Sequence, residues 1–376
     1  MKKLLLLLSS LLVGMHCFAG GILSGPWVAD VREDRLTVVW TTAEPSTAFV
    51  ELKDGTTLWE TFAGRRVFGR LHKVRITGLT PGEVLHYRVG GIPVVDDTNP
   101  RDPTFGDPFA GPWHSTRTFD SAKETCRFSV FNDIHMRTEQ FAALAGQVDS
   151  SATDFLFLNG DIVTAANYTL DSLVHNAIDP LGSLPAGIPL LFARGNHEGR
   201  GNNVQLVADV FPNEDPAPFY YSFREGPVAC LVLDGGETHT KRSTVYSGAK
   251  VYETYLQEQY EWAEKALQEP AFREAPVKVC LIHVPMIDPE GKQGFYIQRW
   301  LHKRFLPLLN EAGIDLMISA DLHEFLFYEP GTMNNAFPIL VNDDLRRLDF
   351  TYGDGTALIR TFNAKGEQEF EYRFQP

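Results

Sequence analysis

The pattern of apolar and polar positions divides the chain into two regions. In residues 20–120, apolar residues recur at every second position, as Leu36, Val38 and Trp40 do, and turns rich in proline and glycine separate the runs. A period of two predicts strands with one buried face, so this region is predicted to be a small all-β sandwich. Within it, residues 91–112 are rich in proline, glycine and aspartate, which predicts a long loop.

The second region, residues 121–376, alternates short apolar runs with helical patterns, after a linker of a few residues. Apolar runs typical of buried strands occur at 128–131, 155–158, 188–193, 277–282 and 316–319. Helical patterns occur at 139–145, 258–267 and 300–309, and strand patterns at 356–362 and 369–374 predict a hairpin. Strands alternating with helices predict a layered α/β sandwich.

The first nineteen residues predict a secretory signal peptide. Lys2 and Lys3 precede an apolar run at 4–13, and Cys17-Phe18-Ala19 has the small-residue pattern of a cleavage site after Ala19. The apolar run is too short to span a bilayer comfortably. We therefore expect signal peptide 1–19 to direct the protein to the periplasm or outside the cell. Further along, no apolar segment approaches membrane-spanning length.

The net charge argues against two classes of partner, and the cysteine content argues against a disulfide framework. A formal net charge of −14 disfavours non-specific binding to nucleic acid or to anionic membranes. After signal cleavage three cysteines remain, Cys126, Cys230 and Cys280, all in or beside apolar runs. They fit buried small hydrophobes better than a disulfide framework, although a single pair is possible. Their spacing matches no zinc site.

Each of the five apolar runs in the second region is followed by residues that bind metals. These strand-end motifs are Asp133-Ile134-His135, Gly160-Asp161, Gly195-Asn196-His197-Glu198, His283-Val284-Pro285 and Asp321-Leu322-His323. In α/β folds, ligands collect beyond the carboxyl ends of strands, and imidazole nitrogens and carboxylate oxygens suit zinc, iron and manganese. A lone Asp-x-His is more often a surface turn, but five such motifs together predict a metal centre.

These motifs, in this order, resemble the calcineurin-like metallophosphoesterases of the binuclear metallophosphatase superfamily. The resemblance covers about two thirds of the chain and implies two mixed β-sheets flanked by helices. It implies hydrolysis of phosphate esters by a hydroxide that bridges two divalent or trivalent ions of iron, manganese or zinc. Residues 79–90 resemble the fibronectin type III-like domain that precedes the catalytic domain of purple acid phosphatases, although Leu85 replaces its usual corner tyrosine. Residues 20–120 are therefore expected to form such a domain.

The resemblance also implies a role for each motif residue. The first metal would be bound by Asp133, His135 and His323, and the second by Asn196, His283 and Asp321, with Asp161 bridging both. His197 would be the general acid beside the leaving group. Glu198 would orient His197 or brace the loop.

Two departures from the family pattern change the expectations. Asp321 stands where the family usually has histidine, which favours harder ions such as manganese, iron(II) or magnesium and leaves open a weak or absent second ion. Thr164 stands where purple acid phosphatases place a ferric-binding tyrosine, so no purple chromophore is expected. Arg137, Arg194 and Arg200 flank the motifs and would either clamp phosphate or form structural salt bridges.

The expected partner is a small-molecule or surface-exposed phosphoester. Two alternatives remain: a phosphodiesterase acting on nucleotide, lipid or glycan phosphodiesters, and a cell-surface module whose metal site is catalytically degenerate. Specificity depends on loops without a transferable motif, so the sequence names no substrate. His239, in a loop after an apolar run, would reach the substrate or stay solvated. The oligomeric state stays open.

Overall fold

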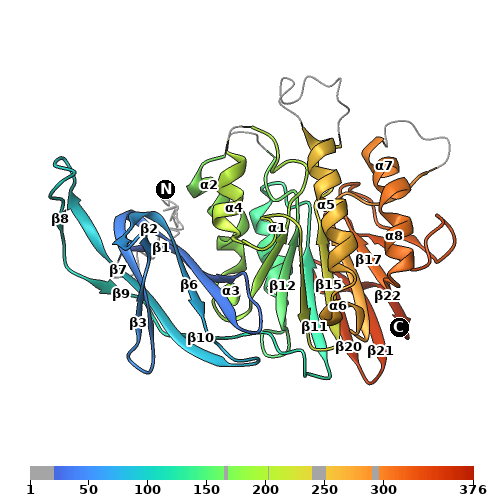
Figure 1. Ribbon diagram of the computed structural model, residues 1–376, viewed down its shortest axis with the longest axis horizontal. Coiled ribbons are helices and arrows are strands. Elements are labelled where there is room, and N and C mark those ends of the chain that lie inside the picture. The colour runs from blue at the N-terminus through green and yellow to red at the C-terminus, as the bar shows by residue number, and fades with distance from the viewer. Residues whose placement is uncertain (1–20, 165–167, 202, 239–250, 290–295) are drawn as a thin grey trace, which may run out of the picture.

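The computed structural model describes residues 21–164, 168–201, 203–238, 251–289 and 296–376. The first region is all-β, as Figure 1 shows. Its strands are β1 (Ile22–Ala29), β2 (Arg35–Leu52), β3 (Thr57–Trp59), β4 (Thr61–Phe62), β5 (Arg65–Arg66), β6 (Phe68–Thr77), β7 (Val84–Asp96), β8 (Thr104–Phe105), β9 (Phe109–Ala110) and β10 (His114–Arg117).

The long strand β2 connects two halves of this region. Its first half pairs with β1 and β6, and its second half pairs with β3 and β7. The register of the β2–β6 pair shifts between Thr41 and Ser46, where the strand changes partners. Apolar side chains from both halves, such as Trp40 and Val50, belong to one core. The fibronectin type III-like topology stays a prediction.

The structure corrects the loop predicted at residues 91–112. Strand β7 continues to Asp96, and the chain returns as β8 and β9, which both pair with β7. Proline and glycine mark the turns of this extension. Gly90 and Gly91 lie within it, and an added Cβ would be 2.4 Å from the Phe109 carbonyl oxygen at Gly90 and 2.1 Å from the Thr47 carbonyl oxygen at Gly91. These glycines therefore permit close strand pairing rather than a loop.

Two six-stranded sheets form the second region. One has the order β13-β12-β11-β20-β21-β22 and the other β14-β15-β16-β17-β19-β18. Their bounds are β11 (Cys126–Phe131), β12 (Phe155–Asn159), β13 (Leu190–Ala193), β14 (Tyr221–Glu225), β15 (Val228–Leu233), β16 (Val277–Ile282), β17 (Leu316–Ser319), β18 (Leu326–Tyr328), β19 (Ile339–Val341), β20 (Arg346–Gly353), β21 (Thr356–Asn363) and β22 (Gln368–Phe374). Both sheets are mixed, since parallel pairs such as β11–β12 stand beside antiparallel pairs such as β11–β20.

Helices cover the outer faces of the two sheets (Figure 1). On one side lie α1 (Thr138–Ala145), α2 (Leu170–Ala177), α3 (Leu184–Gly187) and α4 (Val204–Val210), and on the other α5 (Tyr252–Ala266), α6 (Pro270–Arg273), α7 (Tyr296–Arg304) and α8 (Leu306–Glu311). Between the sheets, Phe128 stacks on Phe155 and Phe350 with ring centroids 4.6 and 4.8 Å apart. The layered α/β sandwich predicted from the sequence is thus confirmed. The helix predicted at 300–309 is two helices, because Pro307 begins a new helix in α8.

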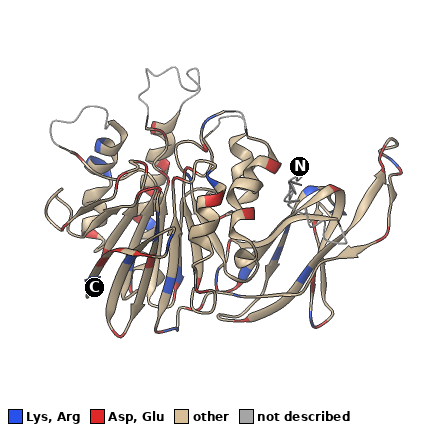
Figure 2. Ribbon diagram, turned by 180° about the vertical axis from the view of Figure 1, so that it is seen from behind, with Lys and Arg blue, Asp and Glu red and all other residues tan. Residues whose placement is uncertain are grey.

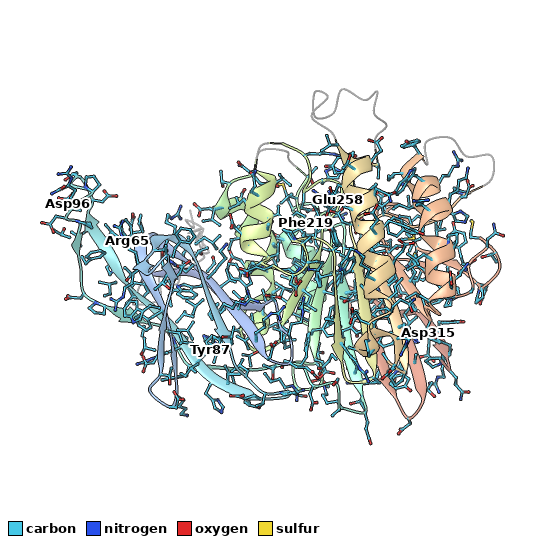
Figure 3. All side chains as sticks on the ribbon, viewed as in Figure 1. Arg65, Tyr87, Asp96, Phe219, Glu258 and Asp315 are labelled. Carbon is cyan, nitrogen blue, oxygen red and sulfur yellow. The ribbon has the colours of Figure 1, made fainter. Side chains whose placement is uncertain are left out.

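The first region packs tightly against the second. Trp27 and Val39 are fully buried in a core shared with α1, α2 and α4, and Trp27 Nε1 donates to the Val210 carbonyl oxygen at 2.8 Å. Tyr87, labelled in Figure 3, is fully buried and donates from its hydroxyl to the Ala186 carbonyl oxygen at 2.8 Å. Strand β2 is therefore buried on both faces in its first half, not on the one face that its alternating pattern predicts.

Opposite charges line this junction (Figure 2). Basic residues of the first region contact acidic residues near α2 and α4: Arg70 with Asp171, Lys73 with Asp209, Arg75 with Glu214, and Arg35 with Asp215. Partly exposed pairs of this kind contribute little individually. In all four pairs the basic residue belongs to the first region and the acidic residue to the second, and this arrangement fixes which faces meet. The burial of Trp27 and its apolar neighbours stabilises the junction.

Four further sequence predictions have different outcomes in the structure. Cys126, Cys230 and Cys280 are buried free thiols, as the simpler reading of their apolar surroundings expects. The signal peptide 1–19 lies outside the described residues. Among those residues no helix combines the length and apolarity that a membrane span requires. The predicted boundary at residue 121 falls in the segment that joins β10 to β11.

Candidate metal centre

The predicted ligands lie where five strands end. Asp133 follows β11, Asp161 follows β12, Asn196 follows β13, His283 follows β16 and Asp321 follows β17. The strands β11, β12 and β13 run parallel in one sheet, and β16 and β17 run parallel in the other. Parallel strands carry their carboxyl ends to the same edge, so these residues converge there.

The backbone at the site adopts a conformation that L-residues rarely use. Asp133, His135, Asp161, Asp321 and His323 all have φ between 48° and 73°. Such left-handed geometry is unfavourable by about 1–2 kcal/mol per residue. Half of the ten non-glycine residues with positive φ among the described residues are thus predicted ligands. Strain concentrated in this way is typical of functional sites, where the surrounding fold holds side chains in place.

Two glycines allow the ligand loops to touch. A Cβ at Gly160 would lie 2.6 Å from the Gly195 Cα and 2.7 Å from the His283 ring. A Cβ at Gly195 would lie 2.2 Å from Asp161 Oδ1 and 2.8 Å from Glu198 Oε2. Only glycine fits at either position, so these residues permit the close approach of the loops after β12 and β13.

Protein donors hold one oxygen of each central carboxylate, and the other oxygen faces the histidines. Asp133 Oδ2 accepts from Asn132 Nδ2 at 2.7 Å and from the Asp321 N–H at 3.3 Å. Asp161 Oδ1 accepts from the His197 N–H at 2.9 Å. Asp133 Oδ1 and Asp161 Oδ2 then lie 3.9 and 3.3 Å from His283 Nε2.

Three of the histidines are oriented through Nδ1, which aims Nε2 at the carboxylates. Nδ1 of His283 lies 2.6 Å from the Asn159 carbonyl oxygen, Nδ1 of His135 lies 3.1 Å from Thr164 Oγ1, and Nδ1 of His323 lies 3.3 Å from Asp344 Oδ2. A carbonyl can only accept, so the His283 Nδ1 carries a proton. Partners of this kind typically fix metal-binding histidines.

The spacing of the facing atoms fits a metal cluster. His135 Nε2 lies 3.7 Å from Asp161 Oδ2, and His323 Nε2 lies 3.8 Å from Asp133 Oδ1. Two ligands about 2.1 Å from one ion lie roughly 3.0–3.4 Å apart at ordinary coordination angles, so these atoms need to move by only a few tenths of an ångström. The group Asp133–His135–His323 coincides with the predicted first ligand set, and Asp161 lies against both His135 and His283.

Unsatisfied polar atoms supply an independent test of fit. Asp133 Oδ1, His135 Nε2 and His283 Nε2 are buried without a hydrogen-bond partner. One end of the Asn196 amide lies 3.2 Å from Asp161 Oδ2 and 3.1 Å from Asp321 Oδ1; as nitrogen it donates to both carboxylates, and as oxygen it meets only acceptors. Buried polar atoms are normally paired, and oxygens this close repel unless a cation lies between them. The residues present therefore fit bound metal ions.

The electrostatics of the buried groups point to the same demand for positive charge. Burial raises the pKa of Asp133, and it raises the pKa of Asp321 to about 6. Burial also acts to raise the pKa of Asp161, but His283 and the His197 N–H lower it to about 2. Burial opposes protonation of His283, yet the carboxylates of Asp161 and Asp133 hold its pKa well above the usual range. In the metal-free protein a proton on His283 thus balances part of the charge that a cation would neutralise.

Asp321 has contacts that suit a ligand. Its Oδ2 accepts from Gln298 Nε2 at 3.0 Å, and its Oδ1 lies 4.0 Å from His283 Nε2 and 3.1 Å from Asn196. One oxygen is therefore anchored and the other points into the cluster. The predicted second set, Asn196, His283 and Asp321, lies together, and its role stays a prediction.

Glu198 braces the site loops and does not contact His197 through its side chain. Its Oε2 accepts from the N–H groups of Asp161 and Gly195, both at 2.9 Å, and its Oε1 accepts from Ile162 at 2.7 Å and Val163 at 3.3 Å. Of the two roles predicted for Glu198, the contacts match the bracing of the loop. Burial, together with the Asp161 carboxylate, raises the pKa of Glu198 to about 7.

His197 lies at the edge of the cluster. Its Nε2 is 3.8 Å from Asp161 Oδ2, and its Nδ1 is 3.2 Å from the Thr164 carbonyl oxygen. The ring lies against His135 at 4.8 Å between centroids. His197 thus lies within reach of an ion held by Asp161 and His135, a group of three that could bind a metal, and its role beside the leaving group stays a prediction.

The three flanking arginines differ in their contacts. Arg194 is buried, pairs with Asp234 at 2.7 Å and stacks over Phe219, which Figure 3 labels, so its role is structural. Arg137 pairs with Asp344 at 2.6 Å. Arg200 reaches His197. His239 lies outside the described residues.

Sequence reasoning missed several residues that position the ligands. Asn132, Thr164, Gln298 and Asp344 hold Asp133, His135, Asp321 and His323 respectively. Asn132 and Thr164 are adjacent to motifs, so their polar type is a usable signal. Gln298 on α7 and Asp344 are more than 20 residues from the ligands they contact, and a single sequence offers no signal for them.

Comparison with known proteins agrees with this geometry. The family model for calcineurin-like phosphoesterases matches residues 126–325, more than half of the chain. Purple acid phosphatase 15 of Arabidopsis thaliana is 22% identical over 291 residues, which cover 68% of this chain and 49% of that protein. The chain thus spans about half the length of this curated relative.

A solved structure extends the likeness to both regions. Purple acid phosphatase PPD1 from yellow lupin (Lupinus luteus) seeds aligns with a TM-score of 0.67 at 17% identity, over 93% of this chain and 74% of that chain. At this identity the likeness shows a shared fold. It includes the all-β first region, because so little of the chain is left unaligned.

Proposed function

The chain belongs to the calcineurin-like phosphoesterase family, and from this we propose that it is an exported, metal-dependent hydrolase of phosphate esters. The observation that carries the proposal is the convergence of Asp133, Asp161 and His283 with unsatisfied atoms facing one another. An acidic cluster of this kind has no structural purpose of its own, because like charges buried together are destabilising.

The proposed ligands divide as the family pattern implies. Asp133, His135 and His323 would hold one ion, Asn196, His283 and Asp321 would hold the other, and Asp161 would contribute to both. Bound ions would activate a water molecule and neutralise charge on the phosphoryl oxygens. The residues themselves fix the ligand positions through Glu198 and the close contact of Gly160 with Gly195.

His197 is the proposed proton donor to the leaving group. Its Nδ1 bonds to the Thr164 carbonyl oxygen, which fixes the ring and leaves Nε2 as the atom that exchanges a proton. His197→Ala should lower turnover and spare metal content, because His197 is not a proposed ligand. Asp161→Asn should lower both.

The proposed substrate is a phosphomonoester, with diesters as the rival. Turnover of p-nitrophenyl phosphate and of bis-p-nitrophenyl phosphate by the metal-loaded protein decides between them. Higher kcat/KM for the monoester supports the proposal, and higher kcat/KM for the diester favours a phosphodiesterase. Cleavage of neither, with fewer than two ions bound, favours a degenerate metal-binding module.

The metals are proposed to be iron, manganese or zinc, with Asp321 shifting preference toward the harder ions. Thr164 has a hydroxyl that contacts His135 Nδ1, but it has no phenolate oxygen that could bind iron. An iron-loaded preparation should therefore lack the purple absorption band. Export is tested by N-terminal sequencing of protein recovered outside the cytoplasm, which should begin at Gly20.

A further inference from the structure

The guanidinium group of Arg200 contacts Glu237, His197 and the side-chain amide of Asn196. Its Nη2 and Nε donate to Glu237 Oε1 and Oε2 at 3.2 and 3.3 Å. Its Nη1 lies 2.7 Å from His197 Nε2 and 3.2 Å from His197 Nδ1. The side chain is 18% exposed. The group is thus anchored on one edge and presents another edge at the proposed proton donor.

The anchor is itself fixed in place. Glu237 is buried and also accepts from Thr238 Oγ1 at 3.2 Å. It follows β15 in a loop that begins at Asp234, whose carboxylate pairs with Arg194 and accepts from the Gly236 N–H at 2.8 Å. A buried, bidentate carboxylate holds a guanidinium in one orientation. Arg200 is therefore preorganised rather than a mobile surface arginine.

We propose that Arg200 binds the phosphoryl group of the substrate, its Nη1 transferring a hydrogen bond from His197 Nε2 to a phosphoryl oxygen. The inference rests on the proposed phosphoesterase function and adds a residue to it. Guanidinium can only donate, and an anionic phosphoryl oxygen is a stronger acceptor than an imidazole nitrogen. An Nε2 that accepts from Arg200 carries no proton, so its release by the incoming phosphate would free it to take up from solvent the proton that it then donates to the leaving group.

Charge supports the assignment. Bound ions would offset the carboxylates of Asp133, Asp161 and Asp321, and a guanidinium beside His197 would add a directional donor for a phosphoryl oxygen that the ions do not supply. Of the three arginines beside the motifs, Arg194 is buried on Asp234 and Arg137 is turned toward Asp344. Arg200 alone among these three contacts His197.

The test is the affinity of the metal-loaded protein for inorganic phosphate, measured by calorimetry, with KM and kcat for p-nitrophenyl phosphate beside it. Arg200→Gln should weaken phosphate binding and raise KM by about 10- to 100-fold, the effect of losing hydrogen bonds to a charged partner. Arg200→Lys should recover part of the affinity, because it keeps the charge without the fork. Arg360→Gln, on β21 and paired with Glu371, is the matched control and should bind phosphate as the wild type does.

Phosphate affinity within twofold of wild type in Arg200→Gln, at full metal content, overturns the proposal. Should Arg200→Gln lose metal or fold poorly, Arg200→Lys decides: several-fold weaker binding supports the assignment and equal binding overturns it. The two proposals fail differently. A wild-type protein that hydrolyses no phosphoester refutes the proposed function, whereas the calorimetric comparison of the variants still tests the phosphate contact.

Discussion

Replacing Gly195 by alanine perturbs the contact on which the metal centre depends. The added methyl carbon would lie 2.2 Å from Asp161 Oδ1 and 2.3 Å from the Asp161 nitrogen. An ordinary contact needs about 3.4 Å, so the loops after β12 and β13 must separate by about 1 Å. Three hydrogen bonds cross this contact or anchor it: His197 N–H to Asp161 Oδ1, Asp161 N–H to Glu198 Oε2, and Gly195 N–H to Glu198 Oε2, each 2.9 Å long.

The magnitude follows from how the loops relax. Overpacking alone is unfavourable by about 1–3 kcal/mol. Each of the three bonds has a carboxylate acceptor, and each one lost adds about 1.5–3 kcal/mol. With one of them broken, we expect the free energy of unfolding to fall by about 2.5–6 kcal/mol. A shift of 1 Å at Asp161 should also lower kcat/KM by about 100-fold.

The assay combines guanidinium denaturation with metal analysis and phosphoester turnover. Gly69→Ala is the matched control, since the nearest atom to a Cβ there is 4.0 Å away. This control should change stability by less than about 1 kcal/mol. If Gly195→Ala equals wild type in stability, metal content and turnover, the two loops do not meet as described, and the account of Asp161 as the central ligand fails.

Three further predictions address the junction and the metal centre. Trp27→Ala should destabilise the protein by about 3–5 kcal/mol in chemical denaturation, because the side chain is fully buried between the two regions. The control is Trp113→Ala: the Trp113 side chain is half-exposed and stacked on Arg88, so its loss should lower the free energy of unfolding by about 1 kcal/mol or less. Thr164→Val should weaken metal affinity by about 10- to 100-fold in a chelator competition, since His135 loses its Nδ1 partner, and unchanged affinity would contradict that role. Chelation of the wild type should lower Tm because the buried carboxylates lose their counter-charge, and an unchanged Tm would argue against bound metal.

Much of this architecture was predictable because its signals are local. Five apolar runs followed by Asp, Asn or His predict strands that end in ligands, and strand ends of parallel pairs meet by geometry. The alternation of apolar runs with helical patterns predicted the layered α/β sandwich, and the order of motifs such as Gly160-Asp161 and Gly195-Asn196 indicated the family. In each case a few adjacent residues carry the information.

What the sequence could not predict depends on contacts between distant segments. Val39 follows a strand pattern with one buried face, yet the second region covers its other face. Glu237 and Asp344 lie far along the chain from Arg200 and His323, and only the fold brings them into contact. The proline-rich segment 91–112 has the composition of a loop, but pairing with β7 makes part of it strand.

Metal stoichiometry of the purified protein, measured together with phosphoester turnover, tests the central claim most directly. The account predicts two ions per chain and hydrolysis in the wild type, two ions with little turnover in His197→Ala, and loss of both in Asp161→Asn. A wild type that hydrolyses phosphoesters with no bound metal, or an Asp161→Asn variant with full metal content and full activity, would contradict it.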